Sequence, residues 1–236
     1  MKERSDEFRP LWRGGVLYRG ESFNADSLLL ASFAARCGAE TVCDLGCGCG
    51  ILLLLLSRES ATRSLTGVEL RADAAERCRE NLAANGLDGC SSVYCADLRT
   101  APVTPGSFEL VVSNPPYFRA EAGGISPQSD RDRMRRESAT LPELCASAAK
   151  LLTPGGSFCL VHRCERMAEV FAALGKAGLE VKRLRFFSAR SDAAPSVFLC
   201  EARRGGAGLR VEPPIFQFGA DGRESAEYRR ITQWED

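Results

Sequence analysis

A glycine-rich segment between two apolar runs constrains the fold of this chain more than any other feature. The sequence Val42-Cys-Asp-Leu-Gly-Cys-Gly-Cys-Gly50 overlaps the short apolar run Thr41–Leu45 and directly precedes the leucine-rich run Ile51–Leu56. Glycines permit the tight turn and close backbone approach that connect a strand to a helix beside a ligand. Periodicity cannot separate helix from strand in so short a run, but its leucine content and its place after the loop favour a helix.

Strands and helices alternate along the remainder of the chain. The expected strands are Thr41–Leu45, Leu65–Leu70, Ser92–Ala96, Phe108–Ser113, Ser157–Val161, Val181–Phe187 and Val197–Ala202. The expected helices are Asp26–Cys37, with Asp26 or Ser27 near its cap, Ala72–Ala84, a helix from the capping box at Thr140 to Leu152, and one from Met167. This alternation predicts an α/β fold with a doubly wound, mainly parallel sheet. The last two strands are joined too closely for a crossover helix, so they should pair antiparallel.

Length and charge limit the architecture and the class of partner. A chain of 236 residues is expected to form one domain, here residues 40–204, with an N-terminal extension 1–39 packed on the ligand site and a C-terminal tail 205–236. Lys plus Arg and Asp plus Glu are both 31, so the net charge is zero. This excludes a strongly basic nucleic-acid binder, and any contact with a nucleic acid must come from a local patch.

Cysteine usage and hydropathy indicate a reduced, intracellular protein. Several of the eleven cysteines lie in apolar segments, such as Cys43, Cys95, Cys159 and Cys200. There is no Cys-x-x-Cys spacing and His162 is the only histidine, so we expect reduced core cysteines and no metal. The longest apolar run, Ile51–Leu56, is far short of the roughly 20 residues of a membrane span, and the N-terminus is too charged for a signal peptide. We therefore expect a cytoplasmic protein that does not enter a membrane.

Three acidic residues lie at the ends of three successive expected strands. Asp44 lies two residues before Gly46, where it would repel a pyrophosphate but suits a ligand with an amine and a cationic centre. Glu69 is placed to accept both hydroxyls of a ribose, and Asp97 to accept from an adenine amine. A glycine turn with capping acids is the plain alternative. An amine, a ribose and an adenine together describe S-adenosylmethionine, and the predicted cofactor residues are Asp44, Gly46, Gly48, Gly50, Glu69, Asp97 and Asn114.

With these residues the sequence resembles the class I S-adenosylmethionine-dependent methyltransferases over about residues 40–204. The family's motif positions correspond to Asp44, Gly46, Gly48, Glu69 and Asp97. The resemblance implies a Rossmann-like, seven-stranded sheet that ends in an antiparallel hairpin.

The segment after the fourth expected strand, Ser113-Asn-Pro-Pro-Tyr-Phe118, carries the second motif. Two prolines make it rigid and lack N–H groups, so the side-chain carbonyl of Asn114 and the backbone carbonyl of Pro115 can accept the two hydrogens of a planar NH₂ group. Tyr117 supplies a ring on which a base stacks. The alternative is a structural proline stop. We predict that Asn114, Pro115 and Tyr117 are catalytic.

This segment resembles the Asn-Pro-Pro-Tyr motif of methyltransferases that act on adenine N6 or on glutamine amides. Tyr18-Arg19, Phe23, the run from Asp26 and Arg136-Glu137 extend the similarity to bacterial valine-tRNA adenine-N6 methyltransferases. That resemblance implies methyl transfer to the adenine beside the anticodon. The residues it implies for substrate binding are Pro116, Tyr117, Phe118, Arg19 and Arg136.

Other functions stay open on sequence grounds. The alternatives are a protein-glutamine methyltransferase, a ribosomal guanine-N2 methyltransferase and a non-catalytic module that binds S-adenosylmethionine or RNA. The chemistry needs no strong base, so His162 is expected to be structural. RNA contacts are expected from the arginines of residues 119–137 and from Lys182, Arg183, Arg185, Arg203, Arg204, Arg229 and Arg230. The sequence leaves the oligomeric state open and favours a monomer.

Overall fold

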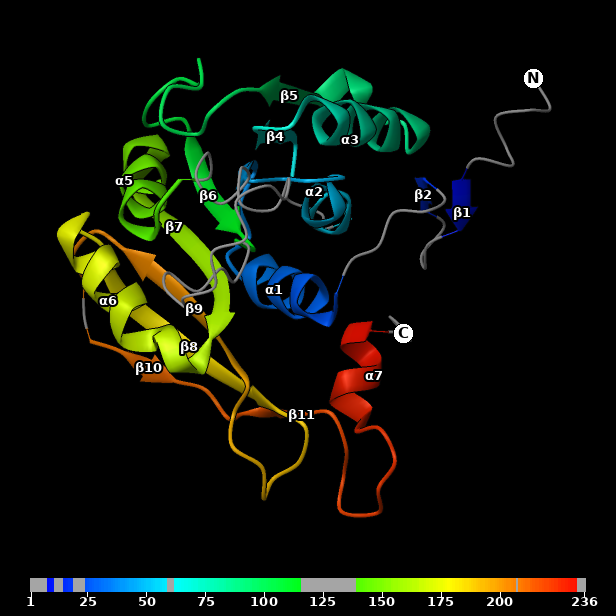
Figure 1. The fold of residues 1–236 in the computed structure, drawn as a ribbon, viewed down its shortest axis with the longest axis vertical. Coiled ribbons are helices and arrows are strands. Elements are labelled where there is room, and N and C mark those ends of the chain that lie inside the picture. The colour runs from blue at the N-terminus through cyan, green and yellow to red at the C-terminus, as the bar shows by residue number, and fades with distance from the viewer. Residues whose placement is uncertain are drawn as a thin grey trace, which may run out of the picture.

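The chain folds around one large sheet with helices on both faces (Figure 1). The computed structural model describes residues 8–10, 15–18, 24–58, 62–115, 139–206 and 208–232. The helices are α1 (Ala25–Ala35), α2 (Ile51–Leu56), α3 (Ala72–Ala84), α5 (Leu141–Leu151), α6 (Met167–Lys176) and α7 (Ala226–Thr232). The strands are β1 (Phe8–Pro10), β2 (Val16–Tyr18), β3 (Thr41–Leu45), β4 (Ser64–Glu69), β5 (Ser91–Cys95), β6 (Phe108–Ser113), β7 (Leu152–Arg163), β8 (Glu180–Ser188), β9 (Val197–Arg203), β10 (Arg210–Val211) and β11 (Ile215–Phe216).

The sheet has the predicted doubly wound topology. Its strand order is β10-β8-β9-β7-β6-β3-β4-β5, and β11 also pairs with β8. Strands β7, β6, β3, β4 and β5 are mutually parallel, whereas β9 runs antiparallel to both β7 and β8. The expected seven strands and the final antiparallel pair are therefore confirmed. The short strands β10 and β11 extend the sheet by pairing parallel with the outer edge of β8.

Side chains that alternate along the central strands build two separate cores. Cys159 and Val161 of β7 pack into the core beneath α1, α2 and α3, whereas Phe158 and Leu160 pack into the core beneath α5 and α6. Successive side chains of a strand point to opposite faces, so a strand buried on both faces is apolar throughout. Figure 1 shows α5 and α6 on one side of the sheet and α1, α2 and α3 on the other.

The boundaries of the helices follow local capping chemistry. The predicted capping box of α5 is present, because Thr140 accepts from the backbone of Glu143 and the Glu143 side chain accepts from the backbone of Thr140. The cap of α1 is Asn24, and Asp26 and Ser27 lie near it in the first turn, as expected. The Asn24 side-chain oxygen accepts from the Ser27 amide, and the helix begins one residue before the acidic residue that appeared to start it.

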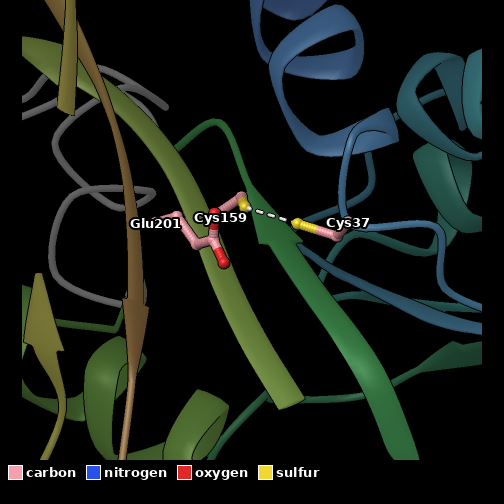
Figure 2. A group of neighbouring side chains, drawn as sticks. All are labelled: Cys37, Cys159 and Glu201. Atoms are coloured by element: carbon pink, nitrogen blue, oxygen red, sulfur yellow. Dashed lines mark hydrogen bonds between the residues drawn. The ribbon is translucent and has the colours of Figure 1, made fainter. Parts of the chain in front are cut away.

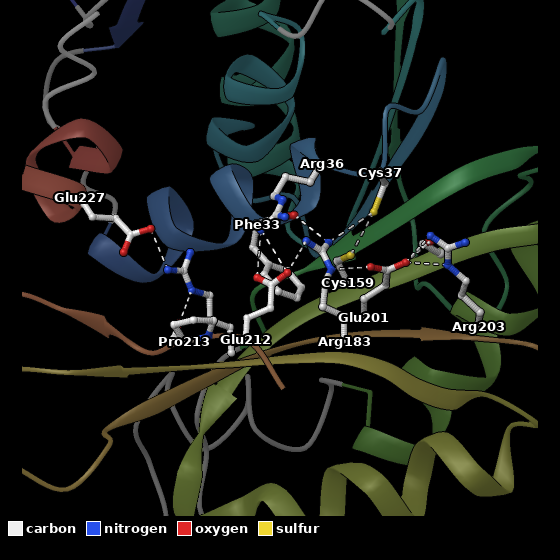
Figure 3. A network of polar contacts seen from close by, with 12 residues as sticks. Phe33, Arg36, Cys37, Cys159, Arg183, Glu201, Arg203, Glu212, Pro213 and Glu227 are labelled. Atoms are coloured by element: carbon white, nitrogen blue, oxygen red, sulfur yellow. Dashed lines mark hydrogen bonds and ion pairs between the residues drawn. The ribbon is translucent and has the colours of Figure 1, made fainter. Parts of the chain in front are cut away.

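Helix α1 is fastened to the sheet by a network of charged side chains centred on Arg183 of β8 (Figure 3). The Arg183 Nε atom lies 2.7 Å from a carboxylate oxygen of Glu201, and its Nη2 donates to the Phe33 carbonyl at 2.9 Å. Glu212, beside β10, accepts from Arg36 at 3.0 Å and lies 3.8 Å from Arg183 Nη1. The network thus connects the C-terminal half of α1 to both the sheet and the tail.

This network corrects part of the expected RNA surface. The Arg183 side chain is only 11% exposed and is held by internal acceptors, so the expectation that it contacts RNA is wrong. Other basic side chains of this region also have internal partners: Lys182 with Glu180 and Gly206, Arg185 with Glu227 and Pro213, Arg203 with Glu201, Arg204 with Ala149, and Arg230 with Glu227. These partners hold the basic side chains against the sheet edge and the tail, while Arg203 and Arg230 stay 42% and 69% exposed and their contacts with RNA stay predictions.

All eleven cysteines lie among the described residues as free thiols, and most of them are buried. Cys90 and Cys95 are exposed, which corrects the expectation that Cys95 is a core residue. Two thiol pairs, Cys37–Cys159 and Cys47–Cys78, have sulfur atoms 3.8 Å apart. The donor atoms of Cys37, Cys159 and Glu201 lie within 4.8 Å of one another (Figure 2), but Arg183 and Arg203 already neutralise Glu201.

No helix in the described part of the chain is both long and apolar enough to cross a membrane.

We predict that Arg183→Ala lowers the free energy of unfolding by about 3 kcal/mol, because it leaves buried Glu201 and Glu212 without their shared cation. Urea denaturation followed by circular dichroism measures this change. Arg63→Ala is the matched control, since the Arg63–Glu40 pair is 3.6 Å long and its side chains are 76% and 56% exposed. Its effect should stay below about 1 kcal/mol. Equal losses in the two variants would contradict a special role for the buried network.

Candidate functional site

The carboxyl ends of four adjacent parallel strands meet along one edge of the sheet. In the order β6, β3, β4 and β5, these ends lead into Asn114, Gly46, Glu69 and Asp97. A cavity of about 490 Å³ lies at this edge. Its lining includes Asn24, Ser27, Asp44, Gly46, Cys47, Gly48, Arg71 and Asn114. Open parallel sheets bind ligands at such positions, as the sequence predicted for this edge.

The glycine loop connects β3 to α2 with three residues in the left-handed region. Gly46, Gly48 and Gly50 have φ angles of 80°, 52° and 84°. A Cβ atom at Gly46 or Gly48 would meet no heavy atom within 4 Å, so conformation and ligand space, rather than packing, account for these two glycines. Gly50 differs, because a Cβ atom there would lie 2.6 Å from the Cys78 sulfur. Gly50 does not line the cavity and serves the packing of α3 on the loop.

Asp44 is a buried acid without a hydrogen-bond partner for one of its oxygens. The residue is 1% exposed, and its Oδ1 atom has no partner among the described residues. Burial and the nearby charge of Glu69 raise the pKa of this carboxyl well above its usual range. An isolated buried carboxylate is unfavourable unless a donor or a cation pairs with it. The lining of the cavity therefore favours a ligand that carries an ammonium group at this position.

Glu69 and Asp97 are brought to the same edge, and each already has partners. The Glu69 carboxylate accepts from the amides of Gly48 and Arg71, both at 2.9 Å, so it holds the glycine loop in place. Asp97 accepts from the backbone and the guanidinium of Arg99, which holds the pKa of that carboxyl below its usual value. Arg99 also donates to Glu143 at the start of α5. Neither acid lines the cavity directly, and their roles toward a ligand stay predictions.

Asn114 directly follows β6, whereas Asp97 follows β5, so the two residues lie at opposite ends of the four strand ends β6, β3, β4 and β5. The preceding residue, Ser113, donates to the Leu45 carbonyl at 2.7 Å and so joins the ends of β6 and β3. The Asn114 amide nitrogen donates to Asn24 at 3.2 Å and to Ser27 at 3.0 Å. Sequence reasoning missed Asn24 and Ser27, because their contact with Asn114 spans about ninety residues. The one available signal was the cap position of the helix that precedes the glycine loop.

Several predicted site residues lie outside the described part of the chain. They are Arg19, Pro116, Tyr117, Phe118 and Arg136, together with the other arginines expected between residues 119 and 137. Pro115 is described and follows Asn114 directly. The predicted stacking and RNA contacts of the residues outside the description stay predictions.

Comparison with known proteins places this geometry in a family. The family model described as methyltransferase small domain matches residues 12–177, a range that includes the glycine loop, the strand-end acids and Asn114. The chain belongs to the methyltransferase small domain family. This membership confirms the resemblance to S-adenosylmethionine-dependent methyltransferases that was seen in the sequence.

Curated proteins of similar sequence share one name, which specifies a tRNA substrate. A Cronobacter sakazakii protein named tRNA1(Val) (adenine(37)-N6)-methyltransferase is 37% identical over 153 residues, which is 63% of this chain and 61% of that one. A Dickeya chrysanthemi protein of the same name is 34% identical over 186 residues, which is 77% of this chain and 72% of that one. The match thus spans about three fifths of the length of the Cronobacter relative.

Solved methyltransferase structures share the fold at low sequence identity. A structure from Agrobacterium tumefaciens, named a predicted O-methyltransferase, has a TM-score of 0.69 at 20% identity and covers 88% of this chain and 95% of its own. A geranyl diphosphate C-methyltransferase from Streptomyces coelicolor, solved with S-adenosyl-L-homocysteine, has a TM-score of 0.54 at 15% identity, with 74% and 78% coverage. These likenesses establish the class I methyltransferase fold and nothing finer.

The donor set of this member of the family fits the cofactor that the family implies. S-adenosylmethionine carries an ammonium group and a sulfonium centre, which are complementary to the buried, unpaired oxygen of Asp44. The open space at Gly46 and Gly48 allows a close approach to the backbone. Glu69 and Asp97 lie at the next two strand ends, in the order in which a ribose and an adenine extend from a methionine.

His162 lies apart from this cavity, as expected for a structural residue. It is 1% exposed within β7, and its Nδ1 accepts from the Arg163 amide at 2.9 Å. Burial and the nearby Arg166 lower the pKa of the imidazole to about 4. The folded protein therefore holds His162 neutral at pH 7.

We predict that His162 makes the free energy of unfolding depend on pH between about 6.5 and 4. In this window the unfolded chain binds the proton and the folded chain does not, so stability falls as the pH falls, by up to about 1.4 kcal/mol per pH unit. The measurement is urea denaturation of the wild type and of His162→Gln at pH 7, 5.5 and 4.5. The wild type should lose more stability than the variant across this range. Parallel losses would show that His162 does not titrate there.

Proposed function

We propose that this member of the family is an S-adenosylmethionine-dependent methyltransferase that acts on the exocyclic N6 amine of an adenine in tRNA, beside the anticodon. The observation that carries the proposal is the placement of Asn114, with its amide held in one orientation, on the same cavity as Asp44 and the glycine loop. The names of the curated relatives support the tRNA substrate. A cytoplasmic location accompanies a tRNA substrate and is part of the proposal, as is the division into an extension, a core domain and a tail.

In this proposal the cofactor is held by residues at the carboxyl ends of β3, β4 and β5. Asp44 pairs with the ammonium group, Gly46 and Gly48 admit the methionine portion, Glu69 accepts from the ribose and Asp97 accepts from the adenine amine. Glu69 can take this part while it keeps its bond to Gly48, because a carboxylate has roughly four acceptor sites. When bound, S-adenosylmethionine supplies a methyl group on a positively charged sulfur that is open to in-line displacement.

Residues of the chain make the target amine reactive by position and hydrogen bonding. The Asn114 side-chain carbonyl and the Pro115 backbone carbonyl accept the two N–H groups of the target amine. These bonds move electron density toward the nitrogen and favour the bent geometry that attack requires. The new N–C bond would form as the S–C bond breaks, which would leave the cofactor as a neutral thioether. No strong base is needed, since the methylated amine is acidic while it is still cationic and can release its proton to solvent water. Positioning of two reactants can contribute roughly 7–11 kcal/mol to such a reaction.

We predict that Glu69→Gln weakens the binding of S-adenosylmethionine about 10- to 100-fold, the range of a lost charge-assisted hydrogen bond. Glutamine keeps one carbonyl oxygen that can accept from Gly48, so the glycine loop should stay in place, whereas the bond from the Arg71 amide is lost. Isothermal titration calorimetry measures the change. Glu76→Gln is the control, because Glu76 is an exposed residue of α3 that pairs with Arg79. Equal affinities of Glu69→Gln and wild type would remove Glu69 from the cofactor site.

We predict that Asn114→Ala lowers the rate of methyl transfer about 10²- to 10³-fold, by analogy with the loss of one transition-state hydrogen bond. The assay is a single turnover with unmodified tRNA and saturating cofactor, and mass spectrometry of the nucleosides identifies the product. Calorimetry with S-adenosylmethionine and circular dichroism confirm that the variant is folded and binds cofactor. Methylation at guanine N2 or at a protein glutamine instead of adenine N6 would overturn the proposed substrate. Near-normal transfer by Asn114→Ala would overturn the role of the motif.

A further inference from the structure

The N-terminal end of α1 contacts the proposed catalytic asparagine directly. Asn24, the cap of α1, accepts from the Ser27 backbone amide at 3.3 Å through its Oδ1 atom. The same Oδ1 accepts from Asn114 Nδ2 at 3.2 Å, and Ser27 Oγ accepts from that nitrogen at 3.0 Å. All three residues line the same cavity. One helix end therefore meets the strand end that carries the second motif.

The direction of these bonds is fixed by chemistry. A backbone amide can only donate, so the Asn24 atom that faces the Ser27 amide must be its oxygen. The other branch of the Asn24 amide donates to the Asp26 carboxylate at 3.1 Å, which agrees with this assignment. An amide oxygen can only accept, so the Asn114 atom that faces Asn24 must be its NH₂ group. Nitrogen and oxygen lie on opposite branches of one planar group, so the Asn114 carbonyl oxygen points away from α1.

We propose that Asn24 and Ser27 are positioning residues that hold the side-chain amide of Asn114 in its catalytic orientation. The inference rests on the proposed function, because the orientation matters only if the Asn114 carbonyl accepts from a target amine. A rotation of the amide by half a turn would present its NH₂ group to the target amine, and two donors would then face each other. Asn24 opposes that rotation, since the flipped amide would place its oxygen against the Asn24 oxygen, and both atoms can only accept. The Ser27 hydroxyl can donate or accept, so it anchors the Asn114 amide beside α1 while Asn24 selects its orientation.

The same arrangement selects the chemical class of the substrate. A fixed carbonyl acceptor complements an exocyclic NH₂ group and disfavours a carbonyl oxygen or a ring nitrogen that carries no hydrogen, because these have only lone pairs to offer. Asn24 and Ser27 thus act on specificity as well as on rate. Their effect on the reaction passes through Asn114.

The test compares Asn24→Ser with Asn24→Asp. Serine is as good a helix cap as asparagine but its side chain is one bond shorter, so it keeps α1 and loses the contact with Asn114. Aspartate keeps both the cap and an acceptor oxygen toward Asn114, and it loses only the donor that Asn24 offers to the exposed Asp26 carboxylate. Under single-turnover conditions with unmodified tRNA and saturating cofactor, Asn24→Ser should react about tenfold more slowly than wild type. Asn24→Asp should restore most of the rate, and the cofactor dissociation constant should change less than the rate in both variants.

A double-mutant cycle with Asn114→Ala identifies the route of the effect. In the Asn114→Ala background, Asn24→Ser should cause no further loss of rate, because the amide that it positions is absent. Additive losses would overturn the proposal. Asn85→Ser is the matched control: Asn85 bonds to Val16 and Asn81 and does not line the cavity, so its substitution should leave the rate unchanged. A loss of rate in this control equal to that of Asn24→Ser would reveal a general effect of stability.

A measurement without turnover separates the inference from the proposed function. The ¹⁵N–¹H signals of the Asn114 side chain are assigned by their absence in Asn114→Ala. These signals should shift in Asn24→Ser and return toward their wild-type positions in Asn24→Asp. If wild type methylates no tRNA while the signals behave in this way, the proposed function fails and the positioning contact stands. If the signals are unchanged in Asn24→Ser, the positioning proposal is overturned whatever the enzyme methylates.

Discussion

Parallel pairing of β6, β3, β4 and β5 determines where the candidate site residues at the strand ends lie, namely Asp44, Gly46, Glu69, Asp97 and Asn114. In this register Asp44 is opposite Val112 on one side and Gly67 on the other, so the ends of three strands fall at the same level. The Ser113 hydroxyl and the amides of Gly46 and Cys47 then join these ends through the Leu45 and Val68 carbonyls. A shift of β3 by one residue would turn Asp44 to the other face of the sheet and separate it from the cavity.

The buried carboxyl of Asp44 is in an unfavourable environment as long as no ligand is bound, because one of its oxygens has no hydrogen-bond partner among the described residues. Burial and the charge of Glu69 both disfavour its ionised form. A cationic ligand reverses this balance, because it neutralises Asp44 and supplies the partner that its Oδ1 atom lacks among the described residues. Glu69 meanwhile holds the Gly48 amide, so the loop is shaped before binding. Binding energy can then go into contact with the ligand rather than into ordering the loop.

Features set by local chemistry could be predicted from the sequence, whereas contacts between distant segments could not. The glycine loop and the Thr140 capping box follow from patterns of a few neighbouring residues, and the structure confirms them. The strands beside the loop end within about one residue of the expected positions, whereas β7 runs from Leu152 to Arg163 and is longer at both ends than the expected Ser157–Val161. The contact of Asn24 with Asn114 depends on how α1 crosses the sheet, which no local pattern reveals. The prediction that Arg183 contacts RNA was wrong for the same reason. A basic residue in a strand of mixed polarity is expected to be exposed, and the ion pair with Glu212 of the tail depends on a segment distant in the sequence. Strands β10 and β11 are two residues each and gain their identity only by pairing with β8.

The two ends of α1 connect the charged network to the site. At its C-terminal end, Arg36 pairs with Glu212 and the Phe33 carbonyl accepts from Arg183, so the tail and the edge of the sheet both hold the helix (Figure 3). At its N-terminal end, Asn24 and Ser27 hold the amide of Asn114. The same helix therefore carries the contacts of Arg183 and Glu212 at one end and those of Asn24 and Ser27 at the other, and it spans the distance from the edge of the sheet to the proposed catalytic carbonyl.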